Sequence, residues 1–256
     1  MKLLGLIPVR KNSTRLPGKA LKLIEGIPAI VHTYLRSSLA KELDDLYVCT
    51  DCNEIADCIL KIGGKVIITG KHINGSERCH EASSSLDYSN ILVIFGDEVL
   101  IDPTHIDVFA QEMKMFQDGN RFFLGHTPFA QSGDHSSFKS VLNIRNETLY
   151  FSREDIPSPS LSKHKNFNKT VFICGFRDSA LKQFVEWGEC ELERREPNEF
   201  LRILYNGEII KSIKLDSAEI SLDTAEDLAT IQRAMKQDKY LKEYGKFKKF
   251  FSGAKA

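Results

Sequence analysis

The sequence carries no excess of charge of either sign. Its 35 lysine and arginine residues balance 35 aspartate and glutamate residues, so the formal net charge is zero over 256 residues. A protein that binds nucleic acid along its surface normally carries a basic surplus. The balance therefore argues against a nucleic-acid partner and confines any phosphate recognition to a local site.

Long apolar runs are missing as well. No stretch approaches the roughly 20 apolar residues that cross a bilayer. Residues 1–8 are too short, and too soon followed by charge, to form a signal peptide. We therefore expect a cytoplasmic protein with no membrane partner.

Cysteine is sparse, and its spacing excludes most metal sites. The chain has six cysteines, which we expect to be free thiols in a cytoplasmic protein. Cys49 and Cys52 have C-x-x-C spacing, but no second pair follows and Cys49 ends an apolar run. A place at the end of a strand is therefore favoured over a redox or zinc site.

The first half of the chain alternates short apolar runs with segments of helical period, and no internal repeat is visible. The runs predict strands at residues 3–8, 46–50, 65–68 and 91–95. The periodic segments predict helices at residues 28–41, 53–62, 76–85 and 103–117. Strands separated by helices indicate an α/β, Rossmann-like fold with a mostly parallel sheet covered by helices.

The second half predicts a smaller mixed α/β part. Expected strands lie at residues 122–125, 140–145, 148–151, 171–176 and 208–215, with a hairpin turn at Asn146 and a loop at 154–169. Expected helices lie at residues 179–187, 193–206 and 224–236. We predict one nucleotidyltransferase domain over 1–256, with 120–205 as an acceptor and dimerisation subregion. A lysine-rich tail at 237–256 is expected to be an exposed helix or a frayed end.

Residues 7–20 form a cationic loop directly after the first apolar run. The loop contains Arg10, Lys11, Arg15 and Lys19, and Pro17 and Gly18 restrict its shape. At the carboxyl edge of a first strand, α/β proteins build polyphosphate sites of this kind. A basic cluster is more often a solvated turn, but the restricted shape favours a loop that binds a nucleoside triphosphate.

Two carboxylates follow apolar runs and could hold Mg²⁺ beside such a loop. Asp97 follows the run at 91–95, and Asp223 precedes the last predicted helix. Magnesium is usually bound by one or two carboxylates together with phosphate oxygens and water. Taken singly, Asp97 could be a turn residue and Asp223 a charge at a helix N-terminus.

These motifs together resemble the cytidylyltransferases that make CMP-3-deoxy-manno-octulosonate. The family's opening is close to I-P-A-R-x-x-S-T-R-L-P-G-K-P-L. The later matches, in the same order, are residues 48–51 (V-A-T-D in the family), 74–78 (S-G-T-E/D-R), 95–98 (Q-G-D-E), 150–153 (Y-F-S-R), 201–207 (L-R and N-G) and 222–228 (V-D-T-P-E-D-L).

The resemblance implies a role for each matching residue. A sugar hydroxyl would attack the α-phosphate of CTP, with Lys19, Arg10 and Asp97 as catalytic residues and Asp97 and Asp223 as ligands of Mg²⁺. The residues that would bind the nucleotide are Pro8, Arg10, Ser13, Arg15, Lys19, Asn74, Gly75, Ser76 and Arg78, with the Ser76 hydroxyl reading cytosine. Arg153 would clamp the carboxylate of an acidic acceptor, although a surface charge at a strand end is the plainer interpretation. The resemblance also implies a homodimer, formed through the hairpin at Asn146 and the aromatic strands at 122–123 and 172–176.

Departures from the family pattern fall at positions that the resemblance assigns to the acceptor. Phe95 replaces a glutamine, Thr170 a histidine and Phe200, beside Glu199, another glutamine; Phe172 replaces a glycine. Each lost hydrogen bond to a buried hydroxyl costs about 1–3 kcal/mol. We therefore expect the octulosonate or a modified acceptor, such as a less hydroxylated or N-substituted sugar acid or a small phosphate. Two alternatives stay open: transfer from UTP or GTP, and an inactive regulatory protein that binds nucleotides.

Overall fold

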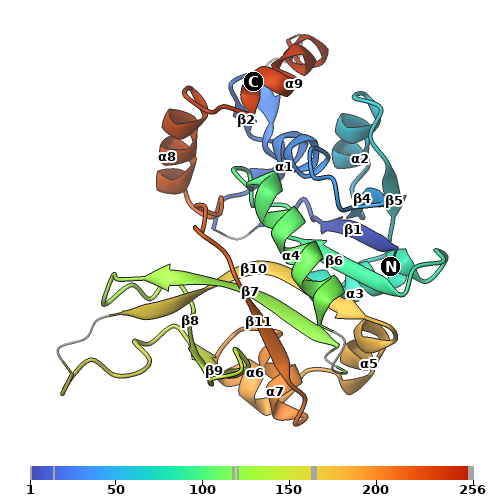
Figure 1. Cartoon of the computed structure of the whole chain (residues 1–256). Coiled ribbons are helices and arrows are strands. Elements are labelled where there is room, and N and C mark those ends of the chain that lie inside the picture. Colours follow the sequence, from blue (N-terminus) through green and yellow to red (C-terminus); the bar gives the residue numbers. More distant parts are fainter. Residues whose placement is uncertain (1, 14, 117–118, 120, 163–165, 253–256) are drawn as a thin grey trace. The chain divides into compact units, whose positions relative to one another are not determined.

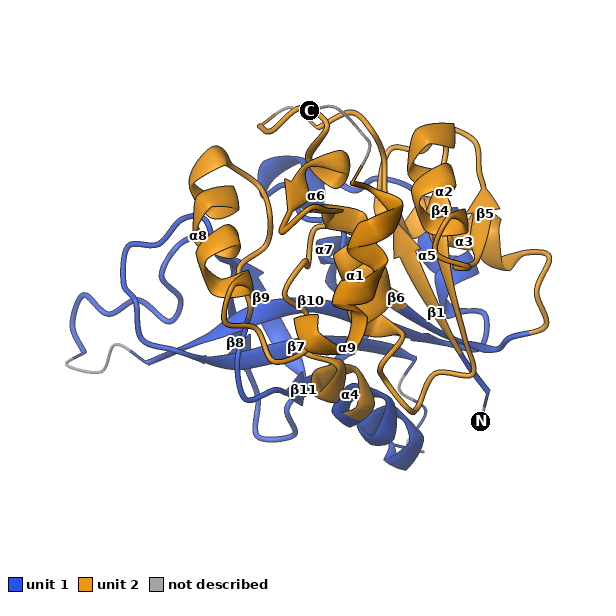
Figure 2. Ribbon diagram, turned by 90° about the horizontal axis from the view of Figure 1, so that it is seen from above, with its two compact units in different colours: residues 1–3, 88–92, 108–218 blue, residues 4–87, 93–107, 219–256 orange. Residues whose placement is uncertain are grey.

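The protein is described here as a computed structural model that covers residues 2–13, 15–116, 119, 121–162 and 166–252. Contacts divide the chain into two compact units (Figure 2). Unit 1 contains residues 1–3, 88–92 and 108–218, and unit 2 contains residues 4–87, 93–107 and 219–256. The predicted subregion 120–205 falls within unit 1, and the single-domain assignment stays a prediction.

Unit 2 is built on parallel strands (Figure 1). Two of them are buried at every residue. β1 (Leu3–Pro8) pairs in parallel with β4 (Asp45–Thr50), which pairs in parallel with β5 (Val66–Ile68). β6 (Asn90–Ile94) lies on the other side of β1, and its last two residues belong to this unit. Strands buried on both faces read as continuous apolar runs, which is why the sequence located β1 and β6. β5 is only partly buried, with Ile68 exposed.

Helices connect these strands, as predicted. α1 (Ala29–Ser37) follows β3, α2 (Asn53–Leu60) follows β4, and α3 (Gly75–Ser83) follows β5. α4 (Pro103–Met115) begins at a proline, whose missing N–H costs nothing in a first helical turn. The 3-10 helix η1 (Lys19–Leu21) and the hairpin of β2 (Leu23–Ile24) and β3 (Ile27–Pro28) were not predicted, since each is only two or three residues long.

Unit 1 holds the strands of the second half. β10 (Phe167–Arg177) pairs antiparallel with β7 (Phe122–Phe129), and β11 (Ile210–Lys214) pairs in parallel with β7. β8 (Lys139–Leu142) and β9 (Thr148–Ser152) form the predicted hairpin, with Asn146 in the left-handed region at φ 55°. β10 begins inside the predicted loop 154–169 because Phe167 pairs with Phe129, a contact that local sequence does not reveal. Residues 163–165 of that loop lie outside the described residues.

The helix predicted at 193–206 is wrong in its continuity. The chain after α5 (Ala180–Trp187) forms two short helices, α6 (Glu191–Arg195) and α7 (Leu201–Tyr205). Pro197 separates them, and Glu196 before it is extended at φ −125° and ψ 90°. Proline cannot continue a helix and disfavours helical backbone in the residue before it.

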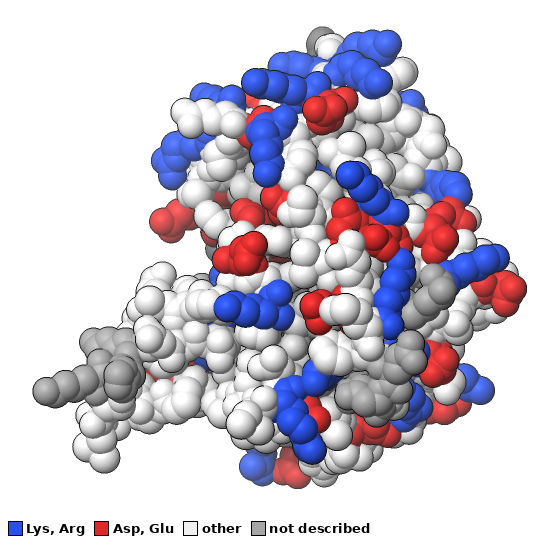
Figure 3. Space-filling model, in the orientation of Figure 1, with Lys and Arg blue, Asp and Glu red and all other residues white. Residues whose placement is uncertain are grey.

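The described part of the tail, residues 237–252, is helical and mostly exposed, in agreement with the first of the two predicted alternatives, but two of its aromatic side chains are buried. After α8 (Ala225–Met235), the chain forms α9 (Leu241–Tyr244) and the 3-10 helix η2 (Gly245–Phe250). Tyr244 and Phe251 are buried in unit 2, and the lysines of η2 point outward, where Figure 3 shows basic side chains gathered over the C-terminal segment. None of the described helices is long and apolar enough to cross a bilayer.

His32 is a buried histidine that joins α1 to this C-terminal segment. Its Nδ1 lies 3.0 Å from the Tyr244 hydroxyl, and its Nε2 lies 2.8 Å from the carbonyl of Ile24. Burial lowers its pKa to about 4. The unfolded chain therefore takes up a proton near pH 6.5 that the folded protein accepts only near pH 4.

Stability is accordingly expected to fall as the pH drops from 6.5 toward 4. A shift of this size is worth about 3 kcal/mol of unfolding free energy. Urea denaturation at a series of pH values measures it, and His32→Gln should flatten the curve over this window. His135→Gln alters an exposed histidine and should leave the wild-type slope. A wild-type stability that is constant between pH 7 and 4.5 would contradict the assignment.

Candidate functional site

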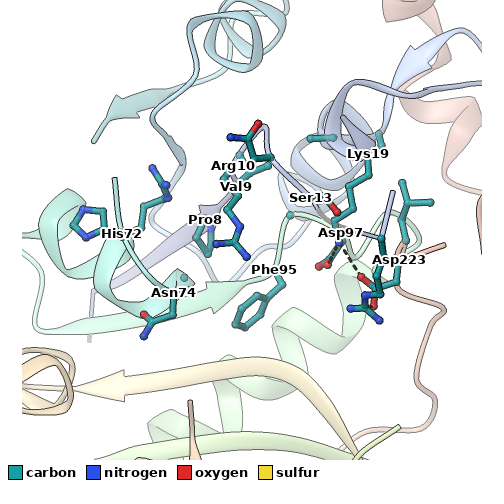
Figure 4. A pocket seen from close by; sticks show the side chains of 18 residues that line it. Pro8, Val9, Arg10, Ser13, Lys19, His72, Asn74, Phe95, Asp97 and Asp223 are labelled. Carbon is teal, nitrogen blue, oxygen red and sulfur yellow. Dashed lines mark hydrogen bonds and ion pairs between the residues drawn. The ribbon is translucent and has the colours of Figure 1, made fainter. Parts of the chain in front are cut away.

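A pocket of about 270 Å³ lies within unit 2 (Figure 4). It is lined by eleven of the residues singled out from the sequence: Pro8, Arg10, Ser13, Arg15, Lys19, Asn74, Gly75, Arg78, Phe95, Asp97 and Asp223. They come from the loop after β1, the start of α3, the turn after β6 and the segment before α8. The carboxyl ends of neighbouring parallel strands meet at one edge of the sheet, and this brings such distant segments together.

Lys19 connects the two carboxylates at the floor of this pocket. Its Nζ lies 2.6 Å from an Asp97 oxygen and 3.0 Å from an Asp223 oxygen, and Arg15 lies 2.9 Å from the other Asp223 oxygen (Figure 4). Burial alone would lower the pKa of Lys19, but Asp97 and Asp223 together raise it. The ammonium is therefore charged at physiological pH and positioned to stabilise further negative charge.

The turn that carries Asp97 is fixed by α1. The Thr33 hydroxyl donates to the carbonyl of Gly96 at 3.1 Å. Arg36 donates from Nε to the carbonyl of Ile101 at 2.7 Å and from a terminal nitrogen to that of Leu100 at 2.8 Å. These donors hold the backbone on both sides of Asp97, so the carboxylate projects from a rigid turn.

Asp223 is tied to the same turn by a backbone hydrogen bond. The N–H of Leu222 donates to the carbonyl of Asp97 at 2.9 Å. Ser221 donates to the Glu98 carboxylate from the same segment. Thr224 and Asp227 then form the predicted capping box of α8. Residues more than 120 positions apart in sequence are thereby kept adjacent.

The cationic loop lies open at the mouth of the pocket. Gly18 has φ 66°, a left-handed conformation that glycine adopts without strain, and it turns the chain into η1 so that Lys19 faces the carboxylates. Arg10 is exposed and donates to the carbonyl of Ile73 at 3.4 Å, and Lys11 pairs with Glu54 away from the pocket. Arg10 and the partly exposed Arg15, which pairs with Asp223, therefore line the pocket, whereas Lys11 does not.

The start of α3 supplies the opposite wall. Asn74 caps the helix by accepting from the N–H of Glu77. A side chain at Gly75 would come within 3.2 Å of Phe95 and of Pro8, so only glycine fits there without displacing a neighbour. Helix N-termini carry free N–H groups and a partial positive charge, which suit an anionic or carbonyl-bearing ligand.

Ser76 and Arg78 are less accessible than their predicted roles require. Ser76 has no exposed surface and is the one predicted nucleotide residue that does not line the pocket. Arg78 lines it but is only 3% exposed, and its guanidinium donates to the Thr69 hydroxyl at 2.5 Å and approaches Asp51 at 3.4 Å. Direct reading of a base by the Ser76 hydroxyl stays a prediction, with backbone groups of α3 better placed.

Phe95 lies with the nucleotide residues and not with the other predicted acceptor residues. It is in unit 2, beside Gly75, whereas Arg153, Thr170, Glu199 and Phe200 are in unit 1. His72 also lines the pocket and was not predicted. Its position two residues before the motif at 74–78 was the available signal.

The acceptor residues predicted in unit 1 differ in their surroundings. The Arg153 guanidinium donates to the carbonyls of His135 and Ser136 at 3.0 and 2.7 Å and lies 4.3 Å from the Phe138 ring centre. Thr170 is 2% exposed, and Glu199 is half-buried at the turn before α7. Both bonds come from one terminal nitrogen, so backbone carbonyls use two of the five N–H donors of Arg153.

Phe200 belongs to a continuous aromatic cluster. It stacks on Phe172 with ring centres 6.2 Å apart and contacts Phe184 at the same distance. Phe172 in turn meets Phe138 at 6.0 Å. Two positions at which the sequence departs from the family pattern, 172 and 200, therefore pack directly on each other.

The donor set of the pocket fits a magnesium ion that arrives with a nucleotide. No described group of three or more histidine, cysteine or carboxylate side chains could hold a metal by itself. Asp97 and Asp223 offer two carboxylates at one point, and magnesium commonly takes its remaining ligands from phosphate and water.

All six cysteines are free thiols, as predicted.

Comparisons with known proteins agree with this geometry. A family model described as cytidylyltransferase matches residues 4–213. The 3-deoxy-manno-octulosonate cytidylyltransferase of Fusobacterium nucleatum is 33% identical, with 93% of this chain and 98% of that protein covered. The enzyme of the same name from Zea mays is 36% identical, with 91% and 80% covered.

A solved structure gives the same assignment. CMP:2-keto-3-deoxy-manno-octonic acid synthetase, complexed with CTP, matches with a TM-score of 0.88 at 29% identity, over 93% of this chain and 99% of that one. The family model covers most of the chain, and the relatives above 30% identity span over nine-tenths of it. The chain therefore belongs to the 3-deoxy-manno-octulosonate cytidylyltransferases within the cytidylyltransferase family, and it is a CTP-dependent nucleotidyltransferase.

Proposed function

We propose that the protein transfers CMP from CTP to the anomeric hydroxyl of 3-deoxy-manno-octulosonate or a closely related sugar acid. The hydroxyl oxygen bonds to the α-phosphorus, the bond between the α- and β-phosphates breaks, and pyrophosphate leaves while the hydroxyl proton passes to solvent. The single observation that best supports this is the contact of Lys19 with both Asp97 and Asp223 inside a pocket lined by cationic loop residues.

The chain's own residues supply binding and charge stabilisation. Arg10 and Arg15 neutralise the triphosphate, and Lys19 stabilises the charge that develops as the anhydride bond breaks. Asp97 and Asp223 would hold Mg²⁺, which when bound orients the phosphates and offsets their charge. The partly exposed ion pairs of Lys19 and Arg15 with the two aspartates support these roles, because they hold the cations beside the carboxylates.

The acceptor is a sugar acid that we place on unit 1. Arg153 is positioned to meet its carboxylate, although two backbone carbonyls already use part of the guanidinium. Phe200, which stands where the family pattern has a glutamine, is buried against the half-buried Phe172 and provides no hydrogen-bonding group. This favours an acceptor that has fewer hydroxyl groups than octulosonate, or one in which a hydroxyl group is substituted.

Pyrophosphate release with CTP, UTP and GTP, each paired with octulosonate and with deoxygenated or amino-substituted analogues, tests the proposal. We expect the rate of pyrophosphate release with CTP to be at least about 10-fold higher than with UTP or GTP. We also expect the acceptor with the highest rate to be octulosonate or one of its analogues. If UTP or GTP supports pyrophosphate release and CTP does not, the nucleotide substrate is that other nucleotide and the proposal for CTP is wrong. If CTP binds and no acceptor gives release, the protein is a nucleotide-binding regulator.

We also propose that the enzyme is a cytoplasmic homodimer, since CTP is available in that compartment. Of the aromatic strands named from the sequence, Phe122, Phe123 and Phe176 are at most 2% exposed and offer little surface for a dimer contact. The β8–β9 hairpin offers a better surface, with Ile144 and Leu149 largely exposed. A monomer by light scattering at micromolar concentration would remove the dimer from the proposal.

A further inference from the structure

His126 and Thr170 face each other across the antiparallel pair of β7 and β10. They are directly opposite in the register, so their side chains lie on the same face of the sheet. His126 is 5% exposed and Thr170 is 2% exposed. Two polar side chains are therefore buried side by side within unit 1.

Each carries a buried polar atom that has no partner among the described residues. Nδ1 of His126 and Oγ1 of Thr170 make no hydrogen bond, although both are shielded from solvent. An unsatisfied buried polar group costs about 1–3 kcal/mol, so native proteins rarely keep one without a use. Two such atoms on paired residues indicate a shared purpose.

The backbone beside them is irregular in a way that marks ligand sites. The register of β10 on β7 shifts between Val171 and Cys174, one residue after Thr170. A side chain at Gly125, next to His126, would lie 2.9 Å from the carbonyl of Val171, so glycine permits this close approach. Such bulges redirect side chains and are frequent next to active sites. Phe172, inside the bulge, stacks on Phe200.

The charges around the pair favour a neutral imidazole. Lys214 of β11 is opposite His126 on the other side of β7 and is exposed. Burial lowers the pKa of His126, and Lys214 lowers it further. A neutral imidazole has one donor and one acceptor nitrogen, and a threonine hydroxyl can donate or accept. A ligand hydroxyl satisfies such a pair because it can donate to one atom while it accepts from the other.

We propose that His126 and Thr170 together bind a hydroxyl group of the sugar-acid acceptor, which makes His126 a specificity-determining residue that no motif predicted. The inference rests on the proposed function for the identity of the acceptor. The unpaired state of the two atoms does not depend on the proposed function, because the melting temperature of the free protein tests it.

Thr170→Val separates a ligand-binding role from a structural one. The substitution keeps the shape and removes an unpaired hydroxyl, so the melting temperature of the free protein should rise. The KM for octulosonate should rise by about 5- to 100-fold, the cost of one lost hydrogen bond to a hydroxyl, while the KM for CTP stays within twofold. His126→Leu should raise the acceptor KM similarly.

Thr148→Val is the matched control. Thr148 is equally buried in unit 1, but its hydroxyl is paired with that of Ser212 at 2.7 Å. Its loss should lower the melting temperature and leave the acceptor KM unchanged.

Two results would overturn the inference: a Thr170→Val protein that melts lower, as the control does, or acceptor binding by calorimetry that neither variant weakens. A wild type that releases no pyrophosphate with octulosonate would instead refute the proposed function. In that case the direction of the Thr170→Val melting shift still decides whether the hydroxyl is unpaired.

Discussion

Asp97→Asn is expected to lower kcat for pyrophosphate release by about 100- to 1,000-fold, the range found when one charge-stabilising group is removed from an active site. The substitution keeps the size of the side chain but removes the charge that Lys19 contacts at 2.6 Å. It also removes one of two carboxylates suited to magnesium. Steady-state kinetics at saturating CTP and acceptor measure the loss.

The fold should tolerate this change, because the Asp97 side chain is one-quarter exposed and Lys19 keeps its contact with Asp223. Asp45→Asn is the control: it removes a carboxylate that pairs with Lys65 at the start of β4, outside the pocket. The control should retain activity within about twofold. Activity of the Asp97→Asn protein within threefold of wild type would show that Asp97 is not part of the catalytic machinery.

The sequence was sufficient for the sheet of unit 2 and for most of the pocket. Strands that are buried on both faces must be apolar throughout, so β1, β4 and β6 could be located without any knowledge of their neighbours. Once these strands are parallel, the loop after β1 and the turn after β6 must share an edge. That is why Lys19 and Asp97 could be placed in one site from sequence alone.

Where the predicted burial or bounds of an element differ from the structure, tertiary contacts explain most of the differences. The C-terminal segment has no strong period, but Tyr244 is buried where its hydroxyl meets His32 of α1. Phe167 extends β10 because Phe129 lies opposite. In contrast, the break between α6 and α7 at Pro197 could have been predicted from the sequence, because a proline rarely lies inside a helix.

Residues that hold the backbone of the site in place could not be recognised from a sequence motif. Thr33 and Arg36 are ordinary positions of an amphipathic helix until the turn after β6 supplies the carbonyls that they hold. His126 lies in a strand whose register with β10 is visible only in the folded unit. Their importance depends on which backbone atoms come near them, and a single sequence does not carry that information.

Arg36→Met is expected to lower the unfolding free energy by about 3–5 kcal/mol, the usual cost of removing one partner from a buried ion pair. Arg36 is 3% exposed, and one terminal nitrogen lies 2.7 Å from Asp238, which joins the C-terminal segment to α1. Its other nitrogens hold the carbonyls of Leu100 and Ile101. Methionine fills much of the volume, but it leaves two carbonyls without their donor and the half-buried Asp238 carboxylate without its cation, with the N–H of Leu241 still donating to that carboxylate.

Urea denaturation of the full chain measures this loss, and Arg233→Met on the exposed face of α8 is the control, with an expected change below about 0.5 kcal/mol. Asp238→Leu should cost less stability in the Arg36→Met protein than in the wild type, because there it removes only the hydrogen bond from the N–H of Leu241 and no ion pair. A double variant that is less stable than Arg36→Met by the full effect of Asp238→Leu alone would show that the two residues act independently. In that case the carbonyls of Leu100 and Ile101, and not Asp238, would be the reason that Arg36 is buried beside the turn of Asp97.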